Sequence, residues 1–279
     1  MCGIIGISSN KPVSANIINS LKKLEYRGYD SAGLATLVNS KINEKKCSGR
    51  VEELEKILFK TPSNGNIGIG HVRWATHGVP NIVNAHPHSS EKVSVVHNGI
   101  IENSDEIKKE LEKKGLQFKS QTDTEVITLL ITEDLKKNEP LESVFKTLGK
   151  LKGSFALGII FKDFPGTIIG ARRGSPLAVG FSKDENYLGS DSYALKSMTN
   201  KISYLDDGDV CVLSKDEVKF YNHNKDKVNK EIFTLSEDKA SVSKGNYKNF
   251  MIKEIFEQPV TIKTTSAKIM SQIKPLTGR

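Results

Sequence analysis

The sequence predicts an α+β fold whose sheets are mainly antiparallel. Three observations lead to this prediction. Strand-like apolar segments occur in blocks, many neighbouring segments are close enough along the chain to form hairpins, and segments with helical spacing are grouped between the blocks. The regular alternation of strands and helices that is typical of a parallel sheet does not occur.

The first predicted elements are a strand and a helix. Cys2–Ser8 is a short apolar run and is expected to be a buried strand. The apolar positions from Ile17 to Leu24 follow helical spacing, and Gly28 ends that helix. The next segments are expected to be strands at Ala32–Val38, Lys41–Cys47, Ile67–Val72 and Val93–His97, with a helix at Val51–Leu58.

Three helices and a second block of strands follow. Helices are predicted to begin near Asn103 and at Thr122, where Thr122 and Glu125 have the spacing of a capping box. A third helix is expected at Leu141–Leu151. The strands expected after it are Ser154–Phe161, Thr167–Ala171, Leu177–Phe181, Tyr187–Ser190, Asp209–Leu213 and Val218–Tyr221.

The chain is expected to contain one domain, at residues 1–220. Residues 221–248 are polar and are typical of a linker. Residues 249–279 return to helical spacing, but this segment of about 30 residues is below the roughly 40 at which domains usually need extra cross-links to fold. We therefore expect it to be the helical start of a further, missing domain.

Composition and charge indicate a globular protein and exclude two classes of partner. Hydrophobic residues make up 37% and charged residues 27% of the chain, which are ordinary values for a soluble domain. No apolar run approaches the roughly 20 residues that a membrane span needs. The net charge is +8, but the lysines within residues 108–114 are mixed with glutamates, as on a solvated helix face. We therefore expect neither a nucleic acid nor a membrane as a partner.

The three cysteines do not form a disulfide framework, because their number is odd and their spacing is wide and irregular. Free thiols are the simpler interpretation, and they indicate a cytoplasmic protein. Cys47 and Cys211 lie in strand-like segments and are expected to be small core residues.

Cys2 directly follows the initiator methionine, and this position gives it a chemical possibility that the other cysteines lack. If Met1 is removed, the new α-amine has an ordinary pKa of about 7.7–8.0 and can accept the proton of the thiol, directly or through a water molecule. One residue then supplies both nucleophile and base. Taken alone, a cysteine at this position is better interpreted as a buried strand residue.

Other motifs change that interpretation. They occur, in chain order, at Tyr26–Ala35, Arg73–Gly78, Asn84–His88, His97–Asn103 and Thr122–Glu125. Together with Cys2, this set resembles the class II glutamine amidotransferases, also called the N-terminal nucleophile amidotransferases. The forms Tyr-Arg-Gly-Tyr-Asp-Ser-Ala-Gly and Arg-Trp-Ala-Thr-His-Gly are most similar to the glutaminase half of the glucosamine-6-phosphate synthases. The resemblance covers about residues 2–215 and the segment Lys253–Pro259.

The resemblance implies a fold and a reaction. The fold is a four-layer αββα sandwich of the N-terminal nucleophile hydrolase type, with mainly antiparallel sheets. The reaction is hydrolysis of L-glutamine to L-glutamate and ammonia through a thioester on Cys2. In this family the ammonia passes to a sugar-phosphate isomerase domain that makes glucosamine 6-phosphate, so L-glutamine and a separate or missing isomerase domain are the expected partners.

Attack on an amide creates an oxyanion, which needs donors already in place. The resemblance assigns this role to the side chain of Asn98 and the backbone N–H of Gly99. It also implies that Arg27 orients the catalytic N-terminus. The alternative for Asn98 and Gly99 is a type I′ hairpin turn, for which Asn-Gly is a strong signal.

The remaining expected site residues would bind the ends of glutamine. The resemblance assigns the α-carboxylate to Arg73, whose guanidinium can bind it with two hydrogen bonds, and the α-ammonium to Asp123. For Asp123, electrostatic support of a helix N-terminus is an alternative or additional role. Trp74, Thr76 and His77 are expected to line or cover the substrate, with Gly78 giving the loop mobility.

No cofactor and no metal are expected. His71, His86 and His88 are the candidates for metal ligands, but no cluster of carboxylates or cysteines has ligand spacing beside them. A serine hydrolase is disfavoured because the chain has no Gly-x-Ser-x-Gly motif. Two alternatives remain: a glutaminase that serves another acceptor, such as phosphoribosyl diphosphate or aspartyl adenylate, and a non-catalytic fragment that binds glutamine or a partner.

Overall fold

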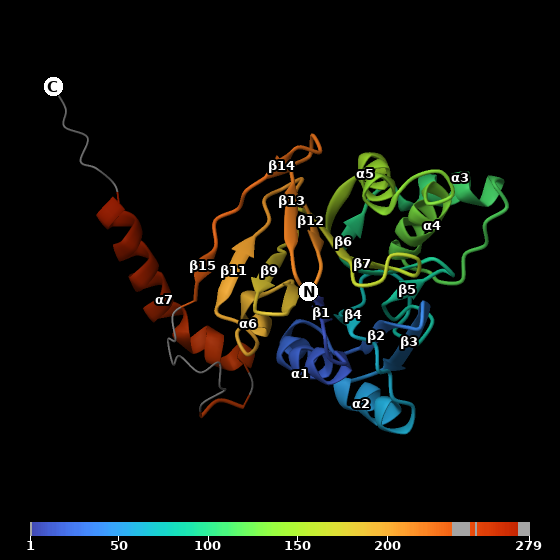
Figure 1. The fold of residues 1–279 in the computed structure, drawn as a ribbon. Coiled ribbons are helices and arrows are strands. Elements are labelled where there is room, and N and C mark those ends of the chain that lie inside the picture. Colours follow the sequence, from blue (N-terminus) through green and yellow to red (C-terminus); the bar gives the residue numbers. More distant parts are fainter. Residues whose placement is uncertain (1, 236–245, 249, 273–279) are drawn as a thin grey trace. The chain divides into compact units, whose positions relative to one another are not determined.

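The structure is a computed structural model, and it describes residues 2–235, 246–248 and 250–272. The chain divides into two compact units, of which the first ends at Leu235 and the second begins at Ser236. All of the strands described below belong to the first unit (Figure 1).

The first sheet has eight strands in the order β15-β11-β9-β10-β1-β4-β2-β3, and all neighbours are antiparallel. Its central strand β1 pairs with β10 on one side and with β4 on the other. The strands are β1 Gly3–Ser9, β2 Ser31–Val38, β3 Lys41–Ser48, β4 Ile67–Arg73, β9 Ala178–Phe181, β10 Glu185–Gly189, β11 Lys201–Tyr204 and β15 Phe233–Thr234.

The second sheet has seven strands in the order β14-β13-β12-β8-β7-β6-β5, again with antiparallel neighbours. The strands are β5 His88–Ser89, β6 Val93–Ile101, β7 Gly153–Phe161, β8 Ile168–Arg173, β12 Val210–Leu213, β13 Val218–Tyr221 and β14 Lys227–Val228.

Helices cover each sheet on its outer face. Helices α1 and α2 pack on the first sheet together with the short α6, whereas α4 packs on the second sheet and is itself contacted by α3 and α5 (Figure 1). Their bounds are α1 Ser14–Leu24, α2 Val51–Lys60, α3 Ser104–Lys113, α4 Thr124–Asp134, α5 Pro140–Lys150 and α6 Ser192–Leu195, with a 3-10 turn η1 at Glu25–Arg27.

The hydrophobic core has three parts because side chains alternate between the two faces of a strand. In β1, Ile5 and Ile7 pack with the residues of α1 and α2, whereas Ile4 packs between the sheets. In β7, Phe155 packs with α4 and α5, whereas Ala156 packs between the sheets. The predicted α+β fold is therefore confirmed, as a helix–sheet–sheet–helix arrangement with antiparallel sheets.

The first unit extends past the predicted boundary at residue 220. Strand β14 pairs with β13, and β15 pairs with β11, although both lie in the range predicted to be a linker. The reason is that Val228 packs against the core between the sheets, which the polar composition of the range concealed. The second unit contains helix α7, Phe250–Gln272. Residues 273–279, also predicted to be helical, lie outside the described part of the chain.

Leu188 allows a test of the core between the sheets. It belongs to β10 of the first sheet, is fully buried, and approaches Gly170 of the second sheet so closely that a Cβ there would lie 2.8 Å from its Cδ1. Leu188→Ala should lower the free energy of unfolding by about 2–5 kcal/mol, because the sheets cannot close over the lost volume. Urea unfolding measures this. Phe59→Ala is the control: that side chain is 90% exposed, and a change within about 0.5 kcal/mol is expected. Equal losses of unfolding free energy in the two variants would contradict the packing of Leu188 between the sheets.

Candidate active site

Cys2 lies at the end of the first sheet, directly before β1. Its thiol contacts the backbone of Trp74, with the Trp74 N–H donating to Sγ at 3.3 Å and Sγ lying 3.6 Å from the carbonyl oxygen. Burial raises the pKa of the Cys2 thiol, and the Trp74 hydrogen bond opposes this only in part. The group is therefore a neutral thiol near pH 7 and needs a base before it can act as a nucleophile.

Gly28 and Asp30 hold the Trp74 backbone beside Cys2. A Cβ on Gly28 would lie 2.5 Å from the carbonyl carbon of Arg73 and 2.7 Å from the nitrogen of Trp74, so only glycine fits against this peptide. The Asp30 carboxylate accepts the N–H of Ala75, and the Asp30 N–H donates to the Arg73 carbonyl at 3.2 Å. The motif at Tyr26–Ala35 therefore supports the Arg73–Trp74 turn, a role that the sequence pattern alone did not indicate.

Asn98 reaches the same point from the second sheet. Its Nδ2 donates to the Cys2 carbonyl at 3.0 Å. Asn98 and Gly99 lie within β6 and pair with Ala156 and Phe155 of β7, so the alternative of a hairpin turn is wrong. Gly99 has a φ of 132°, and a Cβ there would lie 2.0 Å from the Ser154 carbonyl oxygen, so no other residue fits.

Arg73 is the last residue of β4 and is buried. Its Nη2 donates to the carbonyl of His77 and, at 3.4 Å, to that of Gly78. Its Nη1 is buried without a hydrogen-bond partner. The turn that follows β4 therefore folds back onto the guanidinium and satisfies only part of its hydrogen-bonding capacity.

Asp123 precedes α4 and is buried, and its Oδ2 accepts the backbone N–H of Ile101 at 2.8 Å. The predicted capping box at Thr122 is wrong. The helix begins at Thr124, and the Glu125 carboxylate accepts the N–H groups of Lys119 and Ser120 instead. Glu125 therefore fixes the loop before the helix, and the Thr122 hydroxyl contacts Ser120 and His88 instead of capping the helix.

A small cavity joins these residues. Its volume is about 20 Å³, which is little more than the space of a single water molecule. It is lined by Cys2, Arg73, Trp74, Thr76, His77, His86, His97, Gly99, Thr122, Asp123 and Thr124. A cavity of this size does not admit a molecule as large as an amino acid, so the site is closed in this structure.

Arg27 lies apart from this cavity. Its guanidinium forms an ion pair with Asp191 at 2.8 Å, and its Nε donates to the Tyr26 hydroxyl at 3.1 Å. Asp191 also accepts the N–H of Tyr193 at the start of α6. In this structure Arg27 therefore connects η1 to α6 and makes no hydrogen bond with Cys2.

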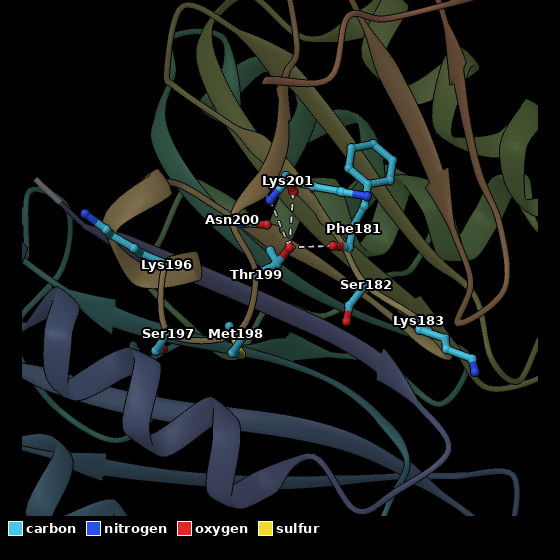
Figure 2. Close-up of a pocket in the computed structure, with 9 residues that line it drawn as sticks. All are labelled: Phe181, Ser182, Lys183, Lys196, Ser197, Met198, Thr199, Asn200 and Lys201. Atoms are coloured by element: carbon cyan, nitrogen blue, oxygen red, sulfur yellow. Dashed lines mark hydrogen bonds between the residues drawn. The ribbon is translucent and has the colours of Figure 1, made fainter. Parts of the chain in front are cut away.

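A larger cavity, of about 620 Å³, is formed by residues of β9, by the segment after α6 and by the start of β11 (Figure 2). Thr199 lies in it, and its hydroxyl makes hydrogen bonds to the backbone of Phe181 and of Lys201 (Figure 2). Cys2 is not among its lining residues.

Known proteins are similar to this chain in sequence and in fold. Residues 81–197 match a family model described as a glutamine amidotransferase domain. The chain is 45% identical to the isomerizing glutamine–fructose-6-phosphate aminotransferase of Zymomonas mobilis, covering 100% of this chain and 46% of that protein. It is 48% identical to the protein of the same name from Brucella abortus, covering 97% and 45%. The chain spans slightly less than half the length of these relatives.

This chain belongs to the class II glutamine amidotransferases.

Solved structures show the same fold. The glutamine phosphoribosylpyrophosphate amidotransferase of B. subtilis superimposes with a TM-score of 0.71 at 24% identity, covering 81% of this chain and 50% of that one. A glutamine aminotransferase class-II domain protein from Silicibacter pomeroyi gives a TM-score of 0.56 at 12% identity, covering 79% and 99%. The amidotransferase fold expected from the motifs is therefore confirmed.

Four buried histidines lie beside the site of this amidotransferase domain, and from the sequence three of them were considered only as metal ligands. They are His71, His86, His88 and His97. The rings of His71 and His86 stack at 4.2 Å between centroids, and His88 meets the edge of His86 at 4.8 Å. Within the residues that the structure describes, no group of three or more histidine, cysteine, aspartate or glutamate residues is placed to hold a metal ion.

Threonine hydroxyls connect this histidine cluster to α4. The Thr124 hydroxyl lies 2.8 Å from His86 Nε2 and 2.9 Å from His97 Nδ1, and the Thr122 hydroxyl lies 3.0 Å from His88 Nε2. Burial is the main cause that lowers the pKa of all four histidines, to about 3 for His71. The cluster is therefore uncharged at neutral pH, and two of its members, His86 and His97, line the cavity.

No helix in the described ranges is both long enough and apolar enough to span a membrane.

Acid should destabilise the domain through this cluster. The folded-state pKa of His71, about 3, lies below its ordinary 6.5, so in the pH range between these values the unfolded chain binds a proton that the folded chain does not. Stability is therefore complete above pH 6.5 and falls as the pH falls, by about 1.4 kcal/mol per pH unit for each such histidine. Urea unfolding of wild type and of His71→Gln between about pH 6 and pH 4 measures this. The free energy of unfolding of the variant should fall less steeply with falling pH, by the contribution of one histidine. Identical slopes for the two proteins would contradict the assignment of a neutral His71.

Proposed function

We propose that this chain hydrolyses L-glutamine to L-glutamate and ammonia through a γ-glutamyl thioester on Cys2. The observation that carries the proposal is the hydrogen bond between Asn98 and Cys2, which come from different sheets, where Cys2 lines a cavity together with Arg73 and Asp123. Membership of the class II glutamine amidotransferases supports glutamine as the substrate.

The nucleophile requires a base because burial keeps the Cys2 thiol protonated. Removal of Met1 provides one, since it frees an α-amine whose ordinary pKa is about 7.7–8.0. The amine takes the thiol proton, the thiolate attacks the amide carbon of glutamine, and the C–N bond breaks with proton transfer to the departing ammonia. Water then hydrolyses the thioester, which releases glutamate and restores the thiol.

The oxyanion that forms during attack needs hydrogen-bond donors. The Asn98 amide group has two N–H bonds, and one of them already donates to the Cys2 carbonyl. The second, together with the backbone N–H of Gly99, is the proposed oxyanion hole. Both groups belong to β6, which pairs with β7 along Val93–Ile101, so the backbone of the second sheet holds them in place.

Arg73 and Asp123 are the proposed partners of the α-carboxylate and α-ammonium groups of glutamine. Arg73 has an unpaired Nη1, and its other hydrogen bonds go to neutral carbonyl groups of the following turn. A carboxylate makes stronger charge-assisted hydrogen bonds with a guanidinium than carbonyls do. Trp74, Thr76 and His77 belong to this turn and line the cavity, so they would contact the bound substrate. Arg27 would act indirectly, by holding η1 against α6.

We propose fructose 6-phosphate as the final acceptor of the ammonia. Identity of 45–48% to proteins named glutamine–fructose-6-phosphate aminotransferases supports this acceptor. Those relatives are about twice as long as this chain, and the sugar phosphate would be converted by the part of such a protein that this chain does not span. In this proposal the first compact unit, which ends at Leu235, forms the glutaminase, and α7 begins the sugar-phosphate isomerase part.

Removal of Met1 should determine whether the chain has glutaminase activity. We expect purified chain that has lost Met1 to release ammonia from glutamine, because only the free α-amine can accept the thiol proton. Cys2→Ala should abolish release and retain glutamine binding. Intact mass measured with an ammonia assay tests both points. Full activity of a preparation that retains Met1 would disprove the free-amine mechanism, and activity of Cys2→Ala would disprove the nucleophile.

Substitutions of Asn98 and of Arg73 should change different kinetic constants. Asn98→Ala should lower kcat by about 10²–10³, the usual result of removing one oxyanion donor. Arg73→Ala should mainly raise KM, because the α-carboxylate is bound alike in the ground and transition states. Steady-state glutaminase kinetics separate the two effects. A change confined to KM in Asn98→Ala would show that Asn98 binds substrate and does not stabilise the oxyanion.

A further inference from the structure

His71 holds the oxygen end of the Asn98 side chain. His71 lies on β4 and Asn98 on β6, so this contact connects the two sheets. His71 Nε2 lies 3.1 Å from Asn98 Oδ1 and 3.0 Å from the backbone carbonyl oxygen of His97. His71 is fully buried, so bulk water does not compete for either contact.

The contacts of His71 determine which way the Asn98 amide faces. The His97 carbonyl can only accept a hydrogen bond, so the proton of the neutral His71 ring resides on Nε2. An Nε2–H donor requires an acceptor opposite it, and that acceptor is the oxygen of Asn98. The amide NH₂ must then face Cys2, whose carbonyl oxygen also only accepts. The opposite orientation would set donor against donor at His71 and oxygen against oxygen at Cys2.

We propose that His71 is a positioning residue for the glutaminase reaction, which keeps the NH₂ group of Asn98 directed at the oxyanion site beside Cys2. The proposal rests on the proposed function, because it requires Asn98 to be the oxyanion donor. His71 itself does not line the cavity and would not touch the substrate.

The surroundings of His71 suit this role. Its ring stacks on His86 with an interplanar angle of 28°, and the Thr124 hydroxyl binds His86 in turn. This stacking fixes the plane of the His71 ring, and therefore the direction of its Nε2–H bond. His71 Nδ1 is buried and has no hydrogen-bond partner, which leaves the Nε2 contacts as the polar interactions of the ring.

Two amide variants separate positioning from simple packing. In His71→Gln the side-chain amide reaches the place of Nε2 and can donate to Asn98 Oδ1, whereas in His71→Asn it ends near the place of Nδ1, one bond too short. We expect His71→Gln to retain most of the wild-type kcat. His71→Asn should lower kcat by up to about 10²-fold with little change in KM, because a small misplacement of a catalytic group has effects of this size. The control His88→Gln changes another buried histidine, one that has no hydrogen bond to Asn98, and its kcat should stay close to wild type.

Double variants make the test specific. If His71 acts only through Asn98, then His71→Asn should have no further effect on kcat in an Asn98→Ala background. The proposal would be overturned if His71→Asn lowered kcat by the same factor in the Asn98→Ala background as in the wild type. It would also be overturned if His71→Asn and His71→Gln had equal kcat values while thermal unfolding showed that both are folded. If His71→Asn does not fold, the Gln variant still decides, because loss of its kcat in a folded protein contradicts the proposal. Absence of glutaminase activity in processed wild type would instead refute the proposed function.

Discussion

The antiparallel register at the end of β4 is the constraint on which the site depends. Gly3 pairs with Val72, and Ser31 pairs with Arg73, so Cys2 and the turn before β2 both arrive beside the Arg73–Trp74 peptide. A shift of register by one residue would turn every side chain of the strand to the opposite face. Because β1 and β4 are buried on both faces, such a shift would place their isoleucines wrongly in two parts of the core at once. The hydrophobic effect therefore fixes the position of Cys2 beside the Arg73–Trp74 peptide.

The second sheet supplies the groups that the proposed function places opposite Cys2. Asn98 and Gly99 come from β6, and Asp123 is tied to the end of the same strand through Ile101. The contact between His71 and Asn98 joins this group to the first sheet through a neutral hydrogen bond. A charged pair in this position would lose several kcal/mol of hydration on burial. The buried histidines provide directional hydrogen bonds at lower cost, because desolvation keeps them uncharged.

Segments with a clear hydrophobic pattern could be predicted from the sequence. Segments that form a strand only because they pair with another strand could not. The apolar run at Cys2–Ser8 and the helical spacing from Ile17 to Leu24 became β1 and α1 within a few residues. Strands β11 and β15 were missed because each is short and has exposed residues, so its pairing depends on a neighbour from a distant part of the chain. The capping box predicted at Thr122 does not form, because the Glu125 carboxylate accepts hydrogen bonds from two backbone N–H groups of the preceding loop.

The same distinction applies to the site. Cys2, Arg73 and Asp123 were named from motifs, and the cavity joins them. The roles of Gly28 and Asp30 could not be predicted, although both lie in the Tyr26–Ala35 motif, since support of a distant backbone peptide leaves no local pattern. The orientation of Asn98 also depends on a contact between strands of different sheets. Sequence therefore indicated which chemical groups are present, while their directions required the packed structure.

The closed cavity shows how binding and rearrangement are coupled at Arg73. In this state the guanidinium is held by the carbonyls of His77 and Gly78, and the space beside Cys2 holds about one water molecule. If Arg73 binds the α-carboxylate as proposed, the carboxylate must replace those carbonyls, which would release the turn that blocks the space. The exchange would be favourable because an ionic hydrogen bond would replace neutral ones in a buried site. A ligand without an α-carboxylate would have to open the turn and leave a buried guanidinium uncompensated. Under the proposed function, the contact that closes the site would therefore also give preference to an amino acid over a simple amide.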